Sequence, residues 1–217
     1  MTPPEPKPRP APEPEAAPAL TPQEAAIAGL SASIAGGAPD DVARLAEAAI
    51  ERGASAAAVY ETALQSYLFV GFPRAIEALF AVRAALSPRG GIPAQAAPRD
   101  LDGWERSGRA LCRSVYGSNF ERLLDVMRSL SPDLADWMIL EGYGKTLSRA
   151  GLAPLTREYA VVAILTTTRM WRQLRSHAIG AVNLGGTRAG VRETIVLCSP
   201  WAGGDAVAEA LGVTGLD

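Results

Sequence analysis

The sequence predicts an all-α protein, a multi-helix bundle built from two related helical units with an inserted helical segment. Helix-start and helix-end signals recur along the chain, and no segment alternates apolar and polar residues as a half-buried strand does. Hydrophobic residues make up 48% of the chain but aromatic residues only 6%. Alanine and leucine therefore supply most of the packing, which favours helices that approach one another closely.

The first 19 residues differ in composition from the rest of the chain. Residues 1–19 are rich in proline, glutamate and alanine. Proline fixes φ and removes a hydrogen-bond donor, so we expect an extended, disordered tail. After it we expect a first helical unit over 20–86, a linker over 87–99 and a second, more complete unit over 100–217.

Helix signals begin directly after the tail. Thr21 and Glu24 form a capping-box pattern around Pro22, which predicts a helix start. A second helix is expected over 39–52, ended by Gly53 in the left-handed conformation. Two more are expected from Ser55 to about 69 and from 73 to about 86.

The linker separates these helices from a second series. Residues 87–99 contain three prolines and two glycines, which is typical of a connector. Helices are then expected near 101–115, 118–130 and 132–149, the middle one starting with a capping box at Ser118. Three or four more fill 154–213.

An internal comparison indicates a duplicated unit. When the chain is shifted by 132 residues, 20–79 aligns with 152–211 without a gap. Gly53 then meets Gly185, Gly71 meets Gly203, and a V-x-E-T pattern recurs in both copies. We interpret the two segments as copies of one multi-helix unit, with 100–151 inserted before the second copy.

The two copies differ at ionisable positions. His177, the only histidine, corresponds to Leu45, and Glu158 corresponds to Ala26. A leucine at the equivalent place indicates a packed surface, where a histidine needs a hydrogen-bond partner or an opening to solvent. Glu158 lies on the preceding predicted helix, and the sequence leaves open whether the helix hairpin brings it to His177.

Residues 141–204 carry a series of short motifs, among them Arg157-Glu158 and the single histidine, His177. This series resembles the carboxymuconolactone decarboxylase family, which is related to the AhpD-like alkylhydroperoxidases. Segments 108–121 and 59–79 resemble further helices of the family. The resemblance implies an AhpD-like helical bundle and chemistry on small molecules. The motifs that carry it are Tyr143-Gly144, Ser148-Arg149-Ala150-Gly151-Leu152, Arg157-Glu158, His177, Gly185 and Val191-Arg192-Glu193.

The chain departs from the peroxidase branch of the family. That branch places a C-x-x-C motif before the histidine, and Met170 and Gln173 stand at those cysteine positions here. Thiol peroxidase chemistry needs a thiolate nucleophile and a resolving thiol, so this activity is the less favoured one. In the decarboxylase branch a glutamate is common where Gln173 stands, and an amide is no general base.

The resemblance implies a carboxy-lyase acting on a small carboxylated lactone or ring compound. Such an enzyme needs a group to hold a carboxylate, a dry pocket and a general acid. Catalytic roles are then implied for His177, Glu158 and Arg157, and substrate binding for Arg149, Gln173 and Trp201. Each of these residues also has a structural interpretation, because arginine and glutamate at helix ends are often surface residues and Trp201 corresponds to Phe69 in the first copy.

A non-enzymatic alternative stays open: a helical, oligomeric or small-molecule-binding member of the family. The family resemblance also implies a homo-oligomer. The net charge of −2 and the lack of a basic stripe predict no nucleic-acid partner. The two cysteines, without a leader or apolar span, predict a cytoplasmic protein that does not enter a membrane. No pattern indicates a metal or another cofactor.

Overall fold

The architecture is described from a computed structural model of the chain, which places residues 19–93 and 99–216. The expected disordered tail lies, except for Ala19, outside the described residues, as do residues 94–98 of the linker. Within the described ranges the protein is all-α and contains no strand, as predicted. None of the described helices is both long and apolar enough to cross a membrane.

The first four helices cover the predicted first unit. The capping box at Thr21 is confirmed, since its hydroxyl accepts from the Glu24 amide and the Glu24 carboxylate accepts from the Thr21 amide. Gly71 interrupts α4 with a φ of 77°. The elements are α1 (Pro22–Gly36), α2 (Pro39–Glu51), α3 (Ala56–Gln65), α4 (Tyr67–Leu86) and the short 3₁₀ helix η1 (Ser87–Arg89).

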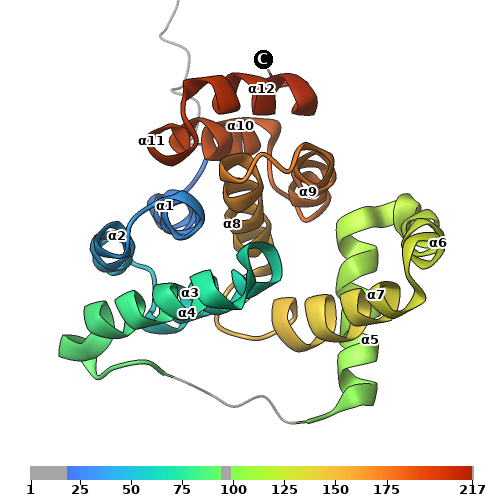
Figure 1. Ribbon diagram of the computed structural model, residues 1–217, viewed down its shortest axis with the longest axis horizontal. Helices are drawn as coiled ribbons and strands as arrows, with labels where there is room; N and C mark the ends of the chain where they lie inside the picture. The colour runs from blue at the N-terminus through green and yellow to red at the C-terminus, as the bar shows by residue number, and fades with distance from the viewer. Residues whose placement is uncertain (1–18, 94–98, 217) are drawn as a thin grey trace, which may run out of the picture.

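The inserted segment forms a separate lobe, on the right in Figure 1. Its elements are α5 (Leu101–Tyr116), η2 (Gly117–Asn119), α6 (Phe120–Leu130), α7 (Pro132–Trp137) and the π-helix η3 (Met138–Leu147). Helix α5 packs directly on η3. A Cβ atom on Gly108 would overlap the carbonyl oxygen of Ile139, and one on Gly144 would overlap that of Trp104, so glycine allows the two backbones to touch.

The last five helices are α8 (Pro154–Thr167), α9 (Trp171–Asn183), α10 (Arg188–Leu197), α11 (Ser199–Ala202) and α12 (Gly204–Thr214). Helix α8 runs through the middle of the molecule and packs along α1 (Figure 1). Every residue of α8 from Thr156 to Thr166 is buried. This explains why the apolar residues of the helix follow no single stripe. Helix α8 therefore joins the hydrophobic clusters on its two sides.

Two expected helix details were wrong. Ser118 does not form a capping box, because Gly117–Asn119 adopt a 3₁₀ turn and α6 begins at Phe120 without a side-chain cap. The single helix expected over 132–149 is instead α7 followed by a π-helix. Its i→i+5 hydrogen bonds have a period that apolar spacing does not distinguish from an α-helix over so few residues.

The helix ends agree with the shift used in the sequence comparison. Helices α2 and α9 are both 13 residues long, and α3 and α10 are both 10 residues long, with starts and ends 132 positions apart. Gly53 and Gly185 follow the ends of α2 and α9 with φ of 90° and 94°, as predicted. These agreements support the interpretation of a duplicated unit.

Candidate active site around His177

Helices α8 and α9 form a hairpin that joins the two ionisable residues of the second unit. His177 Nδ1 lies 2.8 Å from Glu158 Oε2, and both residues are buried. The hairpin therefore brings together two residues that are 19 positions apart, which we call the Glu158–His177 dyad. The sequence alone had left open whether they meet. A carboxylate on Nδ1 fixes the ring orientation and favours the proton on Nδ1, as in a catalytic pair.

The position of His177 follows from the face that α9 buries. Leu174, Ala178 and Ala181 form the buried apolar stripe of α9, and His177 lies beside it. Val182, on the same helix, is exposed. Gly180 lies three residues after His177, and a Cβ there would come within 2.6 Å of Val115 Cγ1 and 3.0 Å of Glu158 Oε2. The lack of a side chain at Gly180 lets α9 approach both α5 and Glu158 of α8.

Aromatic rings from two other helices enclose the imidazole. Phe69 of α4 and Tyr116 of α5 meet it edge-on, with ring centroids 6.0 and 6.3 Å away. Tyr143 of the π-helix lies against Tyr116. Burial is the main cause that raises the pKa of both phenols above the usual value. Both hydroxyls are therefore neutral at physiological pH and able to donate a hydrogen bond.

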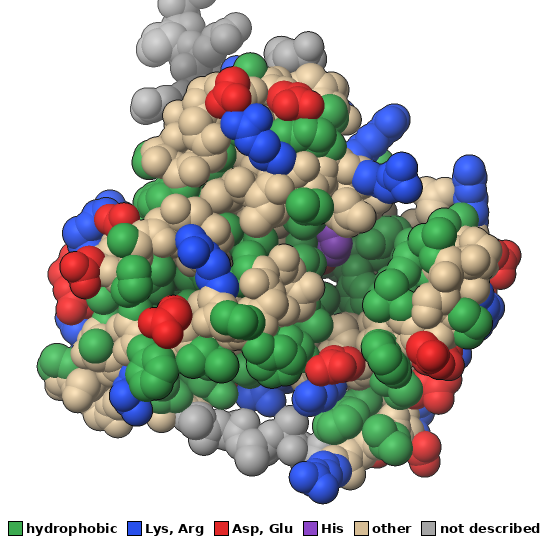
Figure 2. Space-filling model, in the orientation of Figure 1, with side chains coloured by type: hydrophobic (Ala, Val, Ile, Leu, Met, Phe, Trp, Pro, Cys, Tyr) green, Lys and Arg blue, Asp and Glu red, His purple; other side chains and the backbone are tan. Residues whose placement is uncertain are grey.

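The second imidazole nitrogen is the free end of the dyad. No described residue hydrogen-bonds Nε2 of His177, and this atom is not among the buried polar atoms that lack a partner. Figure 2 shows the histidine at the base of a hollow between the α5–α7 lobe and the rest of the molecule. Nε2 is therefore not fully shielded from solvent.

A cysteine lies near the dyad but has no thiolate character. Cys112 of α5 is fully buried, and burial, with the charge of Glu158 as a smaller cause, raises the pKa of its thiol to about 12. Burial likewise raises the pKa of the Cys198 thiol to about 12. Both thiols stay protonated at neutral pH, which makes them poor nucleophiles.

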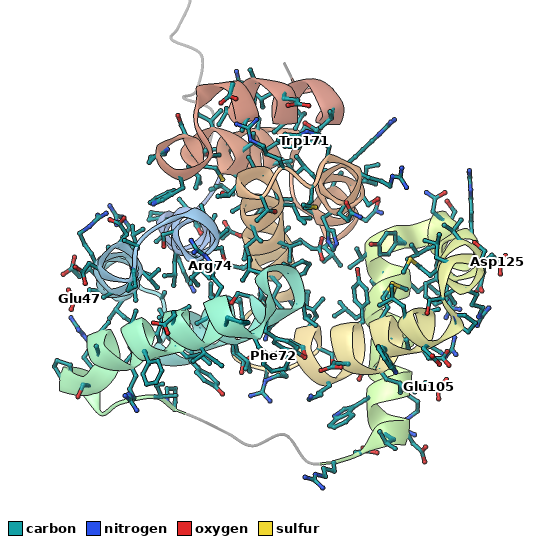
Figure 3. The ribbon with its side chains drawn as sticks, in the orientation of Figure 1. Glu47, Phe72, Arg74, Glu105, Asp125 and Trp171 are labelled. Carbon is teal, nitrogen blue, oxygen red and sulfur yellow. The ribbon has the colours of Figure 1, made fainter. Side chains whose placement is uncertain are left out.

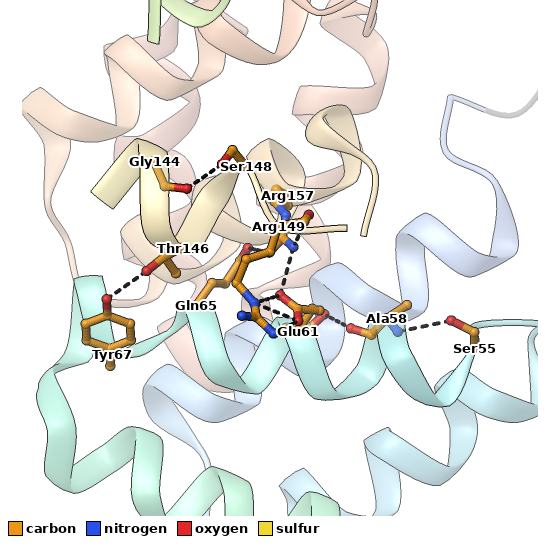
Figure 4. Close-up of polar contacts among 11 residues, drawn as sticks. Ser55, Ala58, Glu61, Gln65, Tyr67, Gly144, Thr146, Ser148, Arg149 and Arg157 are labelled. Atoms are coloured by element: carbon orange, nitrogen blue, oxygen red, sulfur yellow. Dashed lines mark hydrogen bonds and ion pairs between the residues drawn. The ribbon is translucent and has the colours of Figure 1, made fainter. Parts of the chain in front are cut away.

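The two predicted arginines lie in a different cluster (Figure 4). Glu61 of α3 accepts from Arg157 Nη2 at 2.9 Å and from Arg149 Nη2 at 2.8 Å. Arg157 also donates to the Gln65 side chain and to the Arg149 carbonyl. Burial lowers the pKa of the Arg157 guanidinium and Glu61 opposes this effect. These contacts tie the α8 start to α3, which favours a structural role.

The remaining predicted residues lie apart from the dyad. Gln173 is on α9, one turn before His177, and is exposed. Trp201 of α11 packs on the small buried side chains of Ala28, Ala32, Ala163 and Cys198. The structure thus brings together His177 and Glu158, while Arg149 and Arg157 form the cluster with Glu61.

Sequence reasoning did not assign the aromatic residues around His177. Tyr116 and Tyr143 both lie within segments that carry the family resemblance, but nothing in their spacing showed that they meet. Phe69 was considered only as the counterpart of Trp201. Glu61 was recognised as the counterpart of Glu193, and its pairing with two arginines depends on a contact between distant helices.

Comparison with known proteins identifies the family. The model of the carboxymuconolactone decarboxylase family matches residues 132–215, a range that contains both dyad residues. Peroxisomal protein 2 of Schizosaccharomyces pombe (strain 972 / ATCC 24843) is 33% identical over 158 residues, which is 69% of this chain and 72% of that protein. The chain belongs to the carboxymuconolactone decarboxylase family.

The carboxymuconolactone decarboxylase match covers only part of what builds the site. Helices α8 and α9, which carry Glu158 and His177, lie within the matched range. Phe69 and Tyr116, which flank the imidazole, lie before it. The hollow above His177 is therefore formed partly by segments outside the part of the chain that the family model describes.

Proposed function

We propose that the protein is a carboxy-lyase acting on a small carboxylated lactone or ring compound, with His177 as its general acid. The observation that carries the proposal is the buried Glu158–His177 dyad, whose Nε2 is open to the hollow. Family membership supports the reaction class. Met170 and Gln173 stand where the peroxidase branch has its thiols, so the proposed chemistry uses the dyad without them.

The chemistry assigns one proton to each imidazole nitrogen. Loss of CO₂ breaks the carbon–carboxylate bond and leaves the electron pair on carbon, delocalised as an enolate. An imidazolium at His177 then delivers its Nε2 proton to that carbon. The other proton stays on Nδ1, hydrogen-bonded to Glu158 Oε2. Glu158 fixes the orientation of the ring through its contact with Nδ1, which leaves Nε2 directed at the substrate.

The walls of the hollow suit a reaction that loses charge. Phe69 and Tyr116 present ring edges to the imidazole, so the surroundings of the dyad are mostly apolar. A carboxylate that enters these apolar surroundings loses its hydration shell, whereas the neutral CO₂ that leaves has little hydration to lose. The Tyr116 hydroxyl is neutral, because burial raises its pKa. Substrate contacts for Arg149, Arg157, Gln173 and Trp201 remain predictions.

The test is CO₂ release by the purified protein from a panel of carboxylated lactones, compared with His177→Gln and Glu158→Gln. We expect His177→Gln to lower the rate by about 10²-fold to 10⁴-fold, the range for general acid catalysis. Arg175→Gln, at an exposed position on the same helix with no proposed role in the site, is the control. Release at the same rate by wild type and His177→Gln would overturn the acid role.

Only 6% of His177 is accessible, which limits contact between the imidazole and a bound molecule. This observation favours a second function, in which the protein binds a small molecule in the hollow without converting it. Ligand binding that persists in His177→Gln, with no CO₂ released by any form, supports the alternative.

We also propose the cytosol as the compartment, on the basis of the two reduced cysteines. The name of the fungal relative gives the peroxisome as the alternative. Imaging of the tagged full chain beside a peroxisomal marker distinguishes the two: diffuse signal supports the cytosol, and punctate overlap overturns it.

A further inference from the structure

A cavity of about 770 Å³ lies where α3 and α4 meet α5 and the π-helix. Neither His177 nor Glu158 lines it, so it is separate from the dyad, although Arg149 lies on its wall. Its volume falls in the range of pockets that bind small molecules, roughly 300–1,000 Å³. The segments that form it belong to both lobes, and small-molecule sites are often found at such junctions.

The walls of the cavity are unusually aromatic for this chain. Tyr60, Tyr67, Phe72 and Trp104 all line it, although only 6% of the residues are aromatic. Phe72, labelled in Figure 3, lies on α4 beside the gap to the other lobe and is 65% exposed. Large apolar side chains that stay uncovered on a cavity wall indicate a binding surface.

Hydrogen bonds hold one side of the cavity in place. The Tyr67 hydroxyl lies 2.7 Å from Thr146 Oγ1 and donates to Glu141 Oε1 at 3.1 Å. Burial is the main cause that raises the pKa of Tyr67 to about 12, so the phenol stays neutral. The contact joins α4 to the π-helix and sets the width of the cavity between them.

The charges on the cavity wall have one sign. Arg99, Lys145 and Arg149 line it, and no aspartate or glutamate does so among the described residues. Lys145 has only a long contact to Glu141, at 3.4 Å between exposed side chains. Glu141 and Glu61 pair with Lys145 and Arg149, whereas Arg99 forms no ion pair with any described residue. The surroundings of the cavity therefore carry excess positive charge.

We propose that this cavity binds a small amphipathic carboxylate, with an aromatic or acyl body against Phe72 and Trp104 and the carboxylate at Lys145. Apolar walls favour the body through burial of its surface. The excess positive charge favours an anionic head over a neutral or cationic one. The site is independent of the dyad, and the proposal does not rest on the lyase function.

The experiment is calorimetric titration of the purified full chain with decanoate below its micelle concentration. Decanol and decyltrimethylammonium are the charge controls. We expect saturable binding of decanoate and at least tenfold weaker binding of decyltrimethylammonium, because a reversed head charge meets the same cations. Equal affinity for both head groups, or no binding of decanoate, would overturn the proposal.

Matched variants locate the site. Phe72→Ala is expected to weaken decanoate binding about fivefold to tenfold, the effect of losing an aromatic contact. Phe80→Ala removes a similarly exposed ring from the same helix, outside the cavity, and is expected to change nothing. Lys145→Gln is expected to weaken decanoate binding about twofold to fivefold. Arg109→Gln is its control, since it loses a comparable i,i+4 ion pair outside the cavity and should leave binding unchanged.

A second copy of the chain is the competing occupant. The four substitutions affect half-exposed side chains, so thermal melting should show unchanged stability. Light scattering on the same samples measures molar mass. If Phe72→Ala dissociates an oligomer while decanoate binds both forms equally, the cavity belongs to an interface between copies and the proposal is wrong.

Discussion

At the scale of single residues, Glu61 shows how the fold uses a buried carboxylate. It accepts hydrogen bonds from two guanidinium groups, one of them on the fully buried Arg157. Removal of one partner of a buried ion pair leaves the other charge uncompensated, which is strongly destabilising. Its counterpart Glu193 is exposed and, among the described residues, accepts a hydrogen bond only from the Leu20 amide.

We therefore expect Glu61→Ala to lower the free energy of unfolding by about 3–5 kcal/mol. Glu193→Ala is the control, with an expected change of about 0.5 kcal/mol or less, as for a surface substitution. Urea unfolding followed by circular dichroism measures both. Equal losses in the two variants would contradict the structural role of the Glu61 cluster.

The buried thiols make stability depend on pH in the alkaline range. Cys112 and Cys198 have an ordinary pKa of 9.0, raised by burial to about 12 in the folded protein. Between these values the unfolded chain binds fewer protons than the folded one, so stability falls as pH rises above about 9. The contribution is fully present below pH 9.

Unfolding measured from pH 8 to 11 tests this dependence. Cys112→Ala is expected to start from a lower stability because it removes a buried side chain. Its decline with pH should be shallower than that of the wild type, since one titrating group is gone. An identical slope in both proteins would show that the Cys112 thiol does not carry the raised pKa.

At the scale of elements, the approach of α9 to α5 depends on Gly180. A Cβ at 180 meets Val115 Cγ1 and Glu158 Oε2 at less than the usual contact distance. We expect Gly180→Ala to destabilise the protein by about 1–3 kcal/mol, as overpacking does. It should also lower CO₂ release if the dyad acts as proposed.

Gly212 of α12 is the matched control, because a Cβ there meets nothing within 4 Å. Alanine is a better helix former than glycine, so Gly212→Ala should be neutral or stabilising by about 0.5–1 kcal/mol. Thermal melting compares the two. A Gly180→Ala variant as stable as Gly212→Ala would show that α9 has room to move.

The sequence predicted the elements better than the site. The cap at Thr21 and the left-handed glycines after α2 and α9, Gly53 and Gly185, depend on local signals and were found where expected. The π-helix was missed because its hydrogen bonds leave no pattern in ten residues. The hairpin of α8 and α9 was expected, but its register depends on packing between helices, so the distance between Glu158 and His177 was not predictable.

At the scale of the whole molecule, the proposed duplication relates the positions of Glu158 and His177 to apolar positions in the first unit. Helix α1 packs along α8, so the two proposed copies share one core. Leu45 of α2 stands where α9 has His177, and Ala26 of α1 stands where α8 has Glu158. The proposed second copy holds both dyad residues, and the inserted lobe places Tyr116 beside His177.

The homo-oligomer implied by the family remains a prediction. Four large apolar side chains on α6 and α7 are largely exposed: Val126, Leu130, Leu134 and Trp137. We expect light scattering to give a multiple of the 22.7 kDa chain mass, and Leu130→Glu with Trp137→Glu to lower it. A wild-type protein that stays at 22.7 kDa at every concentration would refute the prediction.

The central claim is that Glu158 holds His177 through Nδ1 and leaves Nε2 for chemistry. Because the chain has one histidine, ¹⁵N spectra of its imidazole contain a single set of signals. We predict that the neutral ring carries its proton on Nδ1 and none on Nε2, and that Glu158→Leu removes this preference. A neutral ring protonated on Nε2 in the wild type would contradict the account.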